Sequence, residues 1–203
     1  MSSPKNNSSK LIFSLIVGIP LLVIAFSTLL YQLANRDMIA LGTVNNGELI
    51  QPPVAITDLQ PTHRNGEAVE FNTAESLWQF VVVGDGYCEQ NCEAMLYLTR
   101  QTHTALGKKM NRVGRMYLNL DKQFGAELDK LLIDEHEKLT SAFIDASAYT
   151  AVKQLPLDDE ATGFYVVDPK GWVMMYYHLP DLSQETLTST GKLVIKDMKR
   201  LLR

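Results

Sequence analysis

An uninterrupted apolar run near the amino terminus is the feature that most constrains this chain. Residues 11–30 read LIFSLIVGIPLLVIAFSTLL and contain no charged side chain. A helix of this length spans about 30 Å, which is roughly the hydrocarbon thickness of a bilayer. The apolar core of a cleaved signal peptide is shorter, usually about 7–15 residues. We therefore expect an uncleaved transmembrane anchor over residues 11–31, with a cleaved signal peptide as the alternative.

The charges that flank this run predict its orientation. Lys5 and Lys10 precede it without any acidic residue, whereas Arg36 and Asp37 cancel each other after it. Because positive flanks stay on the cytoplasmic side of a membrane, we expect residues 1–10 to be a cytoplasmic amino terminus. The remainder of the chain is then expected on the periplasmic side of a bacterial inner membrane, held by a single pass.

The rest of the chain is acidic and of a size for one domain. The whole sequence has 203 residues and a net charge of −4, and all 23 acidic residues follow the apolar run. This balance argues against a nucleic-acid partner, which would require a basic face. Turn formers such as Asn45-Asn46-Gly47 and Pro52-Pro53 predict a linker over residues 32–53, with a short strand at residues 48–50. One compact domain is then expected over residues 54–203.

The apolar pattern of this domain predicts alternating strands and helices after an amino-terminal hairpin within residues 54–71. Strands are expected over 77–83, 114–119, 139–144, 163–167 and 172–177, and helices over 93–109, 124–133, 146–154 and 183–202. Alternation predicts parallel pairing, and the closing strand–turn–strand unit makes the sheet mixed. We expect a three-layer α/β fold, with a central mixed sheet and helices on both faces.

Two cysteines mark the one place where the residues indicate chemistry. Cys88 and Cys92 follow the buried strand 77–83, at the point where a helix should begin. Four-residue spacing places both sulfurs on one face of the first turn, with Cα atoms roughly 6 Å apart. That geometry suits either a disulfide or a soft cation such as Cu(I), held by two thiolates. The neighbouring Asp85, Glu89 and Glu93 oppose thiolate formation but attract a metal cation.

A purely structural disulfide is the alternative interpretation of this pair. An oxidising compartment would permit it. However, a disulfide between Cys88 and Cys92 closes a very small loop, which gives little entropic stabilisation. The position at a strand-to-helix junction, where α/β folds usually carry their sites, favours a functional pair.

A membrane anchor, a buried strand and then C-x-x-x-C at the start of a helix resemble the Sco/SenC family. These are thioredoxin-like proteins that help assemble the copper site of cytochrome c oxidase. The resemblance covers residues 54–203 and the anchor, and includes the hairpin at Asp168-Pro169-Lys170-Gly171 and the terminal helix. It implies a thioredoxin-like fold, Cu(I) as the bound ion, and Cys88 and Cys92 as its sulfur ligands or as redox thiols. It also implies cytochrome c oxidase subunits or periplasmic copper carriers as partners.

The chain departs from the family pattern at a histidine. The family's third copper ligand stands just before the first strand of the late hairpin, where residues 159–163 here contain no histidine. His178 ends the second strand of that hairpin, and antiparallel pairing sets it level with the start of the first. We therefore consider His178 as a replacement ligand, with an ordinary surface histidine as the alternative. The motif also lacks the family's prolines, since Glu89-Gln90-Asn91 separate the cysteines.

His136 is the other histidine with a metal-like environment in sequence. It lies between Glu135 and Glu137, so it could bind a divalent cation, although a solvated helix end explains the same pattern.

The sequence therefore leaves three hypotheses for the function. The first is a membrane-anchored Sco-like assembly factor or copper chaperone. The second is a thiol–disulfide oxidoreductase in which Cys88 attacks another protein's cysteine. The third is a non-catalytic thioredoxin-like docking module of a respiratory oxidase complex.

Overall fold

The computed structural model describes residues 7–35, 45–121, 123–151, 155 and 162–203, in two compact units. Unit 1 ends at Val44, and its described residues form the helix α1 (Asn7–Asn35). Its segment Leu11–Leu33 is long and apolar enough to cross a membrane, and no other helix in the described residues is. The predicted apolar helix is thus confirmed by length and composition. The charged flanks at Lys5, Arg36 and Asp37 lie outside the described residues.

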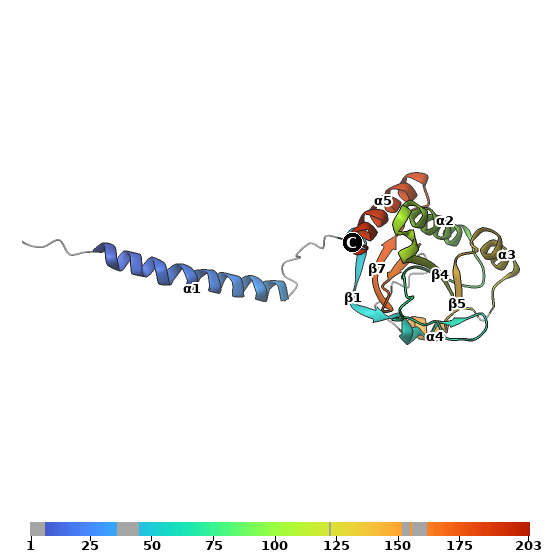
Figure 1. The fold of residues 1–203 in the computed structure, drawn as a ribbon, viewed down its shortest axis with the longest axis horizontal. Helices are drawn as coiled ribbons and strands as arrows, with labels where there is room; N and C mark the ends of the chain where they lie inside the picture. The colour runs from blue at the N-terminus through green and yellow to red at the C-terminus, as the bar shows by residue number, and fades with distance from the viewer. Residues whose placement is uncertain (1–6, 36–44, 122, 152–154, 156–161) are drawn as a thin grey trace, which may run out of the picture. The chain divides into compact units, whose positions relative to one another are not determined.

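Unit 2, residues 45–203, is built on one seven-stranded mixed sheet (Figure 1). Its strands lie in the order β1-β7-β6-β3-β4-β5-β2, with β3, β4 and β5 parallel and the other neighbours antiparallel. The strands are β1 (Glu48–Ala55), β2 (Thr62–His63), β3 (Trp78–Gly84), β4 (Val113–Asn119), β5 (Thr140–Phe143), β6 (Gly163–Val167) and β7 (Trp172–His178). The central strands are covered on both faces, which explains their continuous apolar runs.

Helices cover both faces of this sheet, as predicted. One face carries α2 (Gln90–Ala105), α3 (Ala126–Glu135) and α5 (Gln184–Leu201), whose apolar sides share one core with β3, β4, β6 and β7. On the other side the short helix η1 (Ile56–Leu59) contributes to a second core, and α4 (Ala146–Ala151) packs near η1. A further short helix, η2 (Gly107–Arg112), leads from α2 into β4. The mixed three-layer α/β architecture is therefore confirmed.

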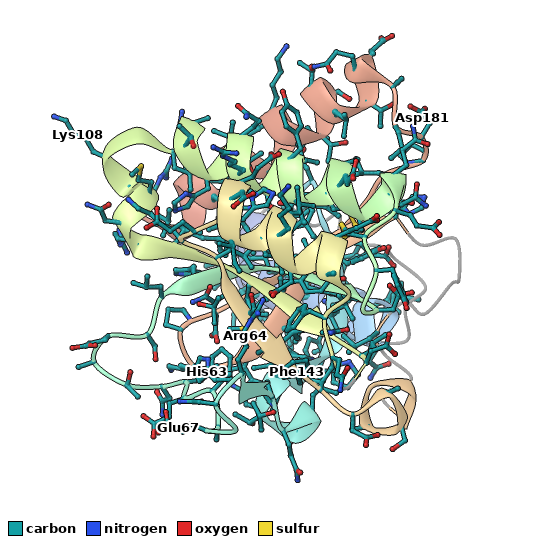
Figure 2. The ribbon with its side chains drawn as sticks, turned by 90° about the vertical axis from the view of Figure 1, so that its right-hand side faces the viewer. His63, Arg64, Glu67, Lys108, Phe143 and Asp181 are labelled. Carbon is teal, nitrogen blue, oxygen red and sulfur yellow. A yellow bond between two sulfur atoms is a disulfide. The ribbon has the colours of Figure 1, made fainter. Side chains whose placement is uncertain are left out.

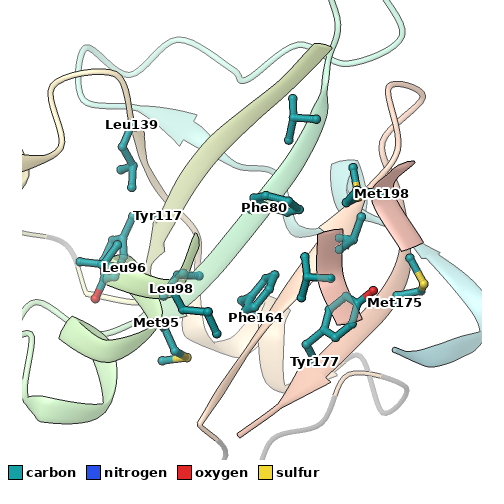
Figure 3. Packing of buried hydrophobic residues seen from close by; sticks show 14 of the residues in the cluster. Phe80, Met95, Leu96, Leu98, Tyr117, Leu139, Phe164, Met175, Tyr177 and Met198 are labelled. Atoms are coloured by element: carbon teal, nitrogen blue, oxygen red, sulfur yellow. The ribbon is translucent and has the colours of Figure 1, made fainter. Parts of the chain in front are cut away.

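The first core is organised around aromatic rings on the sheet (Figure 3). Phe164 lies between Phe80, whose ring is 5.6 Å away and edge-on, and Tyr177, whose ring is 5.4 Å away and stacked. These offset and edge-to-face arrangements are the favourable ones for aromatic pairs. Leu96 of α2 and Met198 of α5 are fully buried against the same layer. This core fixes α2, and with it the cysteine-bearing end, against the sheet.

The amino-terminal part of unit 2 differs from the prediction. The linker was expected to reach Pro53 with only a short strand at residues 48–50, but β1 runs from Glu48 to Ala55 and pairs with the edge of β7. Pro52 and Pro53 make this strand hard to predict from the sequence, because a proline donates no backbone hydrogen bond. The pairing shifts register between Leu49 and Val54, so the prolines occupy an irregular part of an edge strand, where they are tolerated.

The predicted hairpin within residues 54–71 is replaced by a tight loop beside a short strand. β2 pairs with β5 across the sheet, and only one isolated bridge, between Thr62 and Ala68, joins the two sides of the loop. Figure 2 shows His63 and Arg64 at this edge, near Phe143 of β5. The Arg64 guanidinium lies 4.2 Å from the centre of the Phe124 ring and pairs with Asp129.

A buried carboxylate fastens the start of unit 2 to its last helix. The Asp197 side chain is completely buried and accepts hydrogen bonds from the backbone N–H and side-chain amide of Asn46, both at 2.7 Å. It also accepts from the Gly47 N–H at 3.2 Å, from the Tyr177 hydroxyl at 2.9 Å and from Arg200 at 3.3 Å. Figure 1 accordingly shows the carboxyl-terminal end of α5 beside the start of β1.

Replacing this carboxylate should destabilise unit 2 strongly. We expect Asp197→Ala to lower the free energy of unfolding by about 3 kcal/mol or more, because several buried donors lose their acceptor together. Tyr177→Phe removes only one of those donors and should cost about 1 kcal/mol. Urea unfolding followed by tryptophan fluorescence measures both, since the two tryptophans lie in unit 2.

The neighbouring exposed lysine gives the control. Lys196→Ala should change the unfolding midpoint little, and an Asp197→Ala effect no larger than that of Lys196→Ala would contradict the assigned role.

Candidate functional site

The cysteine pair lies in the loop between β3 and α2, at the carboxyl end of the parallel strands. Cys88 precedes the helix cap Glu89, and Cys92 is the third residue of α2. The two are joined in a disulfide with their Cα atoms 5.1 Å apart. Both side chains are half-buried and pack against the first core. The prediction that these residues meet where the helix begins is confirmed, although Cys88 lies just before the first turn and not on it.

The start of α2 leaves polar backbone groups beside the sulfurs. The first backbone bond of the turn runs from the Glu93 N–H to the Glu89 carbonyl, and the Glu89 side chain does not cap the helix. The amides of the first turn therefore lack helical partners and add to the positive end of the helix dipole. Such a position favours a thiolate over a thiol when the disulfide is reduced.

Carboxylates oppose this effect. Asp85, Glu89 and Glu93 are all exposed around the pair, and the segment 85–93 contains no lysine or arginine. Their negative charge disfavours thiolates and attracts cations. The electrostatics of the loop therefore suit a thiolate pair whose charge is neutralised by a bound cation.

Tyr117 of β4 lies beneath the pair, and no sequence pattern predicted its role here. Its hydroxyl is 4.0 Å from the Cys92 sulfur and donates a 2.8 Å hydrogen bond to the Asp85 carbonyl. Burial, followed by the charges of Asp85 and Asp121, raises the pKa of this phenol, which therefore stays protonated at neutral pH. Gly84 makes room for it, because a Cβ there would lie against the Tyr117 hydroxyl.

A second loop, between β4 and α3, holds the cysteine loop in place. The Gly86 N–H donates to the Asp121 carboxylate at 2.8 Å, and the Gly125 N–H donates to the Gly86 carbonyl at 2.7 Å. Fully buried Asn119 supports this second loop by bonding the Asp121 N–H and the Gln123 carbonyl, both at 3.0 Å. The cysteine loop is thus held by Tyr117 of the sheet and by the loop between β4 and α3.

His178 lies on a different part of the sheet. It pairs with Gly163, so it stands level with the start of β6 as predicted, and its side chain is exposed. However, Tyr177 belongs to the core on the cysteine side of the sheet, and successive strand residues point to opposite faces. The described residues contain no group of three histidine, cysteine or acidic side chains that could hold a metal. The structure therefore does not gather His178 with Cys88 and Cys92.

His136 is buried, so the prediction of a solvated helix end is wrong. Only 6% of it is exposed, and its Nδ1 accepts a 3.3 Å hydrogen bond from Arg115 of β4. Burial, together with the charges of Arg115 and Arg100, lowers the pKa of His136 to about 4. The ring is therefore neutral at pH 7 and serves as a hydrogen-bond acceptor. A charged residue within the apolar strand 113–119 was the available signal for this cluster.

The cysteine loop as a whole can support two kinds of chemistry. Oxidised, it holds a disulfide; reduced by two electrons and two protons, it offers two neighbouring sulfurs at the start of α2. Two soft sulfurs without a nearby histidine suit Cu(I) better than a hard or octahedral cation.

Comparison with known proteins places this site in a family. Residues 78–203 match the family described as transmembrane-like, thioredoxin-like, C-terminal domain. No curated protein matches the sequence.

Solved structures with the same fold include several Sco proteins. Arabidopsis thaliana ScoI with copper bound is 14% identical at a TM-score of 0.52, over 74% of this chain and 99% of that chain. Apo Sco1 from Thermus thermophilus is 16% identical at 0.52, over 80% and 99% of the two chains. Yeast Sco1 with copper bound is 16% identical at 0.51, over 78% and 95%. These likenesses confirm a Sco-like, thioredoxin-like fold.

The close approach of Gly84 to Tyr117 gives a test of how the cysteine loop is held. Gly84→Ala should lower the free energy of unfolding by about 2 kcal/mol, because the new methyl group displaces the Tyr117 hydroxyl. In a Tyr117→Phe background the same change should cost less, since the hydroxyl is gone. A double-mutant cycle from urea unfolding measures this coupling, and simple additivity of the two changes would contradict the packing described.

Buried His136 predicts a pH dependence of stability. Between its ordinary pKa of 6.5 and its folded value of about 4, the unfolded chain binds a proton that the folded chain does not. Stability contributed by this group is therefore complete above pH 6.5 and is lost as the pH falls towards 4. We expect His136→Asn, which keeps an acceptor for Arg115, to reduce the slope of unfolding free energy against pH in this range. His178→Asn, at an exposed strand end, is the matched control, and equal slopes in both variants would contradict the assignment.

Proposed function

Because this chain belongs to the family of transmembrane-like, thioredoxin-like C-terminal domains, we propose that it is a membrane-anchored, Sco-like copper-handling protein. In this proposal α1 is an uncleaved single-pass anchor in a bacterial inner membrane, with residues 1–10 in the cytoplasm and the domain in the periplasm. Cys88 and Cys92 bind Cu(I) after reduction of their disulfide. The protein then assists copper loading or assembly of a cytochrome c oxidase.

One observation carries this proposal. Two sulfur side chains, with Cα atoms 5.1 Å apart, open the first helix after a buried strand of a thioredoxin-like sheet. Two of the solved structures with this fold, from Arabidopsis thaliana and yeast, have copper bound. The exposed carboxylates at Asp85, Glu89 and Glu93 add a negative field that favours a bound cation.

Two cysteine ligands also suit a copper ion that is bound only until it is passed to a partner. Cu(I) accepts two thiolates readily, and its binding to thiols releases protons. In our proposal no third protein ligand closes the site, because His178 belongs to the other face of the sheet. A ligand supplied by a partner, such as an oxidase subunit or a periplasmic copper carrier, would complete the coordination during transfer.

Copper titration of the reduced full-length protein in detergent tests this proposal. We expect one Cu(I) per chain in competition with a chromogenic Cu(I) chelator. Cys88→Ser and Cys92→Ser should each weaken binding by more than about a hundredfold, since each removes one of two direct ligands. His178→Ala should leave the affinity unchanged, and His63→Ala, in the edge strand β2, is its matched control.

The contrary outcomes are distinct. Absence of Cu(I) binding together with turnover of a protein dithiol would favour a thiol–disulfide oxidoreductase, with Cys88 as the attacking thiol. Absence of both, together with oxidase assembly that survives the two serine variants, would favour a docking module. Loss of affinity in His178→Ala alone among the histidine variants would restore His178 as a ligand.

A further inference from the structure

A second polar centre lies at the amino-terminal end of β4, whereas the cysteine pair lies near the carboxyl-terminal end of the same strand. Arg115 belongs to the amino-terminal half of β4 and is only 7% exposed. Its Nη2 donates to the Leu96 carbonyl at 2.8 Å, to the Thr99 hydroxyl at 3.2 Å and to His136 Nδ1 at 3.3 Å, and its Nε donates to the Thr99 hydroxyl at 3.4 Å. Every acceptor in this set is neutral.

The charge of Arg115 therefore lacks a counter-ion within the described part of the chain. The ion pairs found there, Arg64 with Asp129 and Arg200 with Asp197, involve other residues. Neutral acceptors satisfy N–H groups but do not neutralise a buried guanidinium, and an uncompensated buried charge is costly. Burial and then the nearby charge of Arg100 lower the pKa of Arg115 to about 10.

This cation faces a pocket of about 510 Å³. Arg100, Arg115 and His136 line it together with apolar groups from Leu77 and Val113. The hydrogen bonds of Arg115 use Nε and Nη2, which leaves both protons of Nη1 without a partner in the described residues. Nη1 is not among the buried unpaired atoms of the described residues, so it keeps some exposure to solvent.

The acidic residues that line the pocket do not serve as the counter-ion of Arg115. Asp134, Glu135 and Glu137 also line the pocket, and all three are exposed to solvent. None of them lies within 4.0 Å of Arg115 or Arg100, whereas Lys138 adds a further positive charge at the same rim. The three acidic and three basic side chains of the lining balance in number, but no carboxylate lies close enough to pair with Arg115.

We propose that this pocket binds a small oxyanion of the phosphate or carboxylate class, held by Arg115 Nη1 and by Arg100. Guanidinium groups are the preferred partners of both anions, because their N–H groups match the oxygen geometry and stay charged. A bound anion would supply the negative charge that the buried arginine lacks. The proposal is independent of copper, since the cysteine loop lies at the other end of β4.

The test is anion binding by the full-length protein in detergent. Inorganic phosphate and acetate are each compared with chloride at equal ionic strength, and the unfolding equilibrium is followed by tryptophan fluorescence. At ten times its dissociation constant, a bound anion should raise the folded-to-unfolded ratio about tenfold. Stabilisation by phosphate alone points to a phosphate-type ligand, and stabilisation by acetate points to a carboxylate; either supports the site.

Three variants test whether the anion binds in this pocket. Arg100→Gln changes an exposed side chain and should weaken anion binding about tenfold without unfolding the domain. Lys192→Gln, an exposed cation on α5, should leave binding unchanged. Arg115→Gln should abolish the stabilisation in protein that still shows a cooperative transition.

Two results would overturn the proposal. One is equal unfolding midpoints in phosphate, acetate and chloride. The other is equal weakening of anion binding by Arg100→Gln and Lys192→Gln, because that would indicate non-specific screening.

Discussion

The parallel pairing of β3 with β4 is the constraint on which the candidate site depends. It sets Gly84 opposite Asn119, so the loops that leave the two strands emerge side by side. The β4 loop can then bond the cysteine loop through Asp121 and Gly125, while Tyr117 supports it from below. Each of these contacts joins residues more than 30 positions apart in sequence, and none would form if β4 were shifted along β3. The disulfide therefore lies on a support that the sheet itself positions.

One strand and one helix connect two centres of opposite electrostatic character. The carboxyl end of β4 and the start of α2 frame the cysteine pair among exposed carboxylates. The amino end of β4 and the middle of α2 frame Arg115, whose hydrogen bonds to Leu96 and Thr99 fasten the same helix to the sheet. In our proposals the first centre favours a cation and the second an anion. A single packed layer can serve both because charges at opposite ends of a sheet are well separated.

The sequence predicted most of the sheet because its central strands are buried on both faces. Continuous apolar runs such as 77–83 and 163–167 have no other stable location in a domain of this size, and the structure confirms them. The proximity of the cysteine pair was equally predictable from its short spacing, although the structure places Cys88 just before the helix and not within it. Only residues 48–50 of β1 were predicted as a strand, because Pro52 and Pro53 suppress strand propensity, although an irregular edge strand accommodates them.

The features that could not be predicted depend on residues that are distant in sequence but adjacent in the fold. Tyr117 reads in sequence as one more core aromatic, and only the crossing of two loops gives its hydroxyl a role. His136 reads as solvated because its neighbours are acidic, yet the partner that buries it, Arg115, lies 21 residues earlier. His178 was placed correctly along β7, but the face on which it lies depends on the alternation of the strand relative to the core.

The bonds made by Asp197 have a mechanical consequence. Any pull on the chain before Asn46 reaches three hydrogen bonds to this one carboxylate before it reaches β1. β1 is an edge strand with an irregular middle, so tension applied directly to it would peel it from β7 one bond at a time. Asp197 instead passes the load to α5, whose long apolar side is packed across the core, so that many contacts resist the force together. A domain tethered by its amino-terminal end can in this way bear tension without exposing the edge of its sheet.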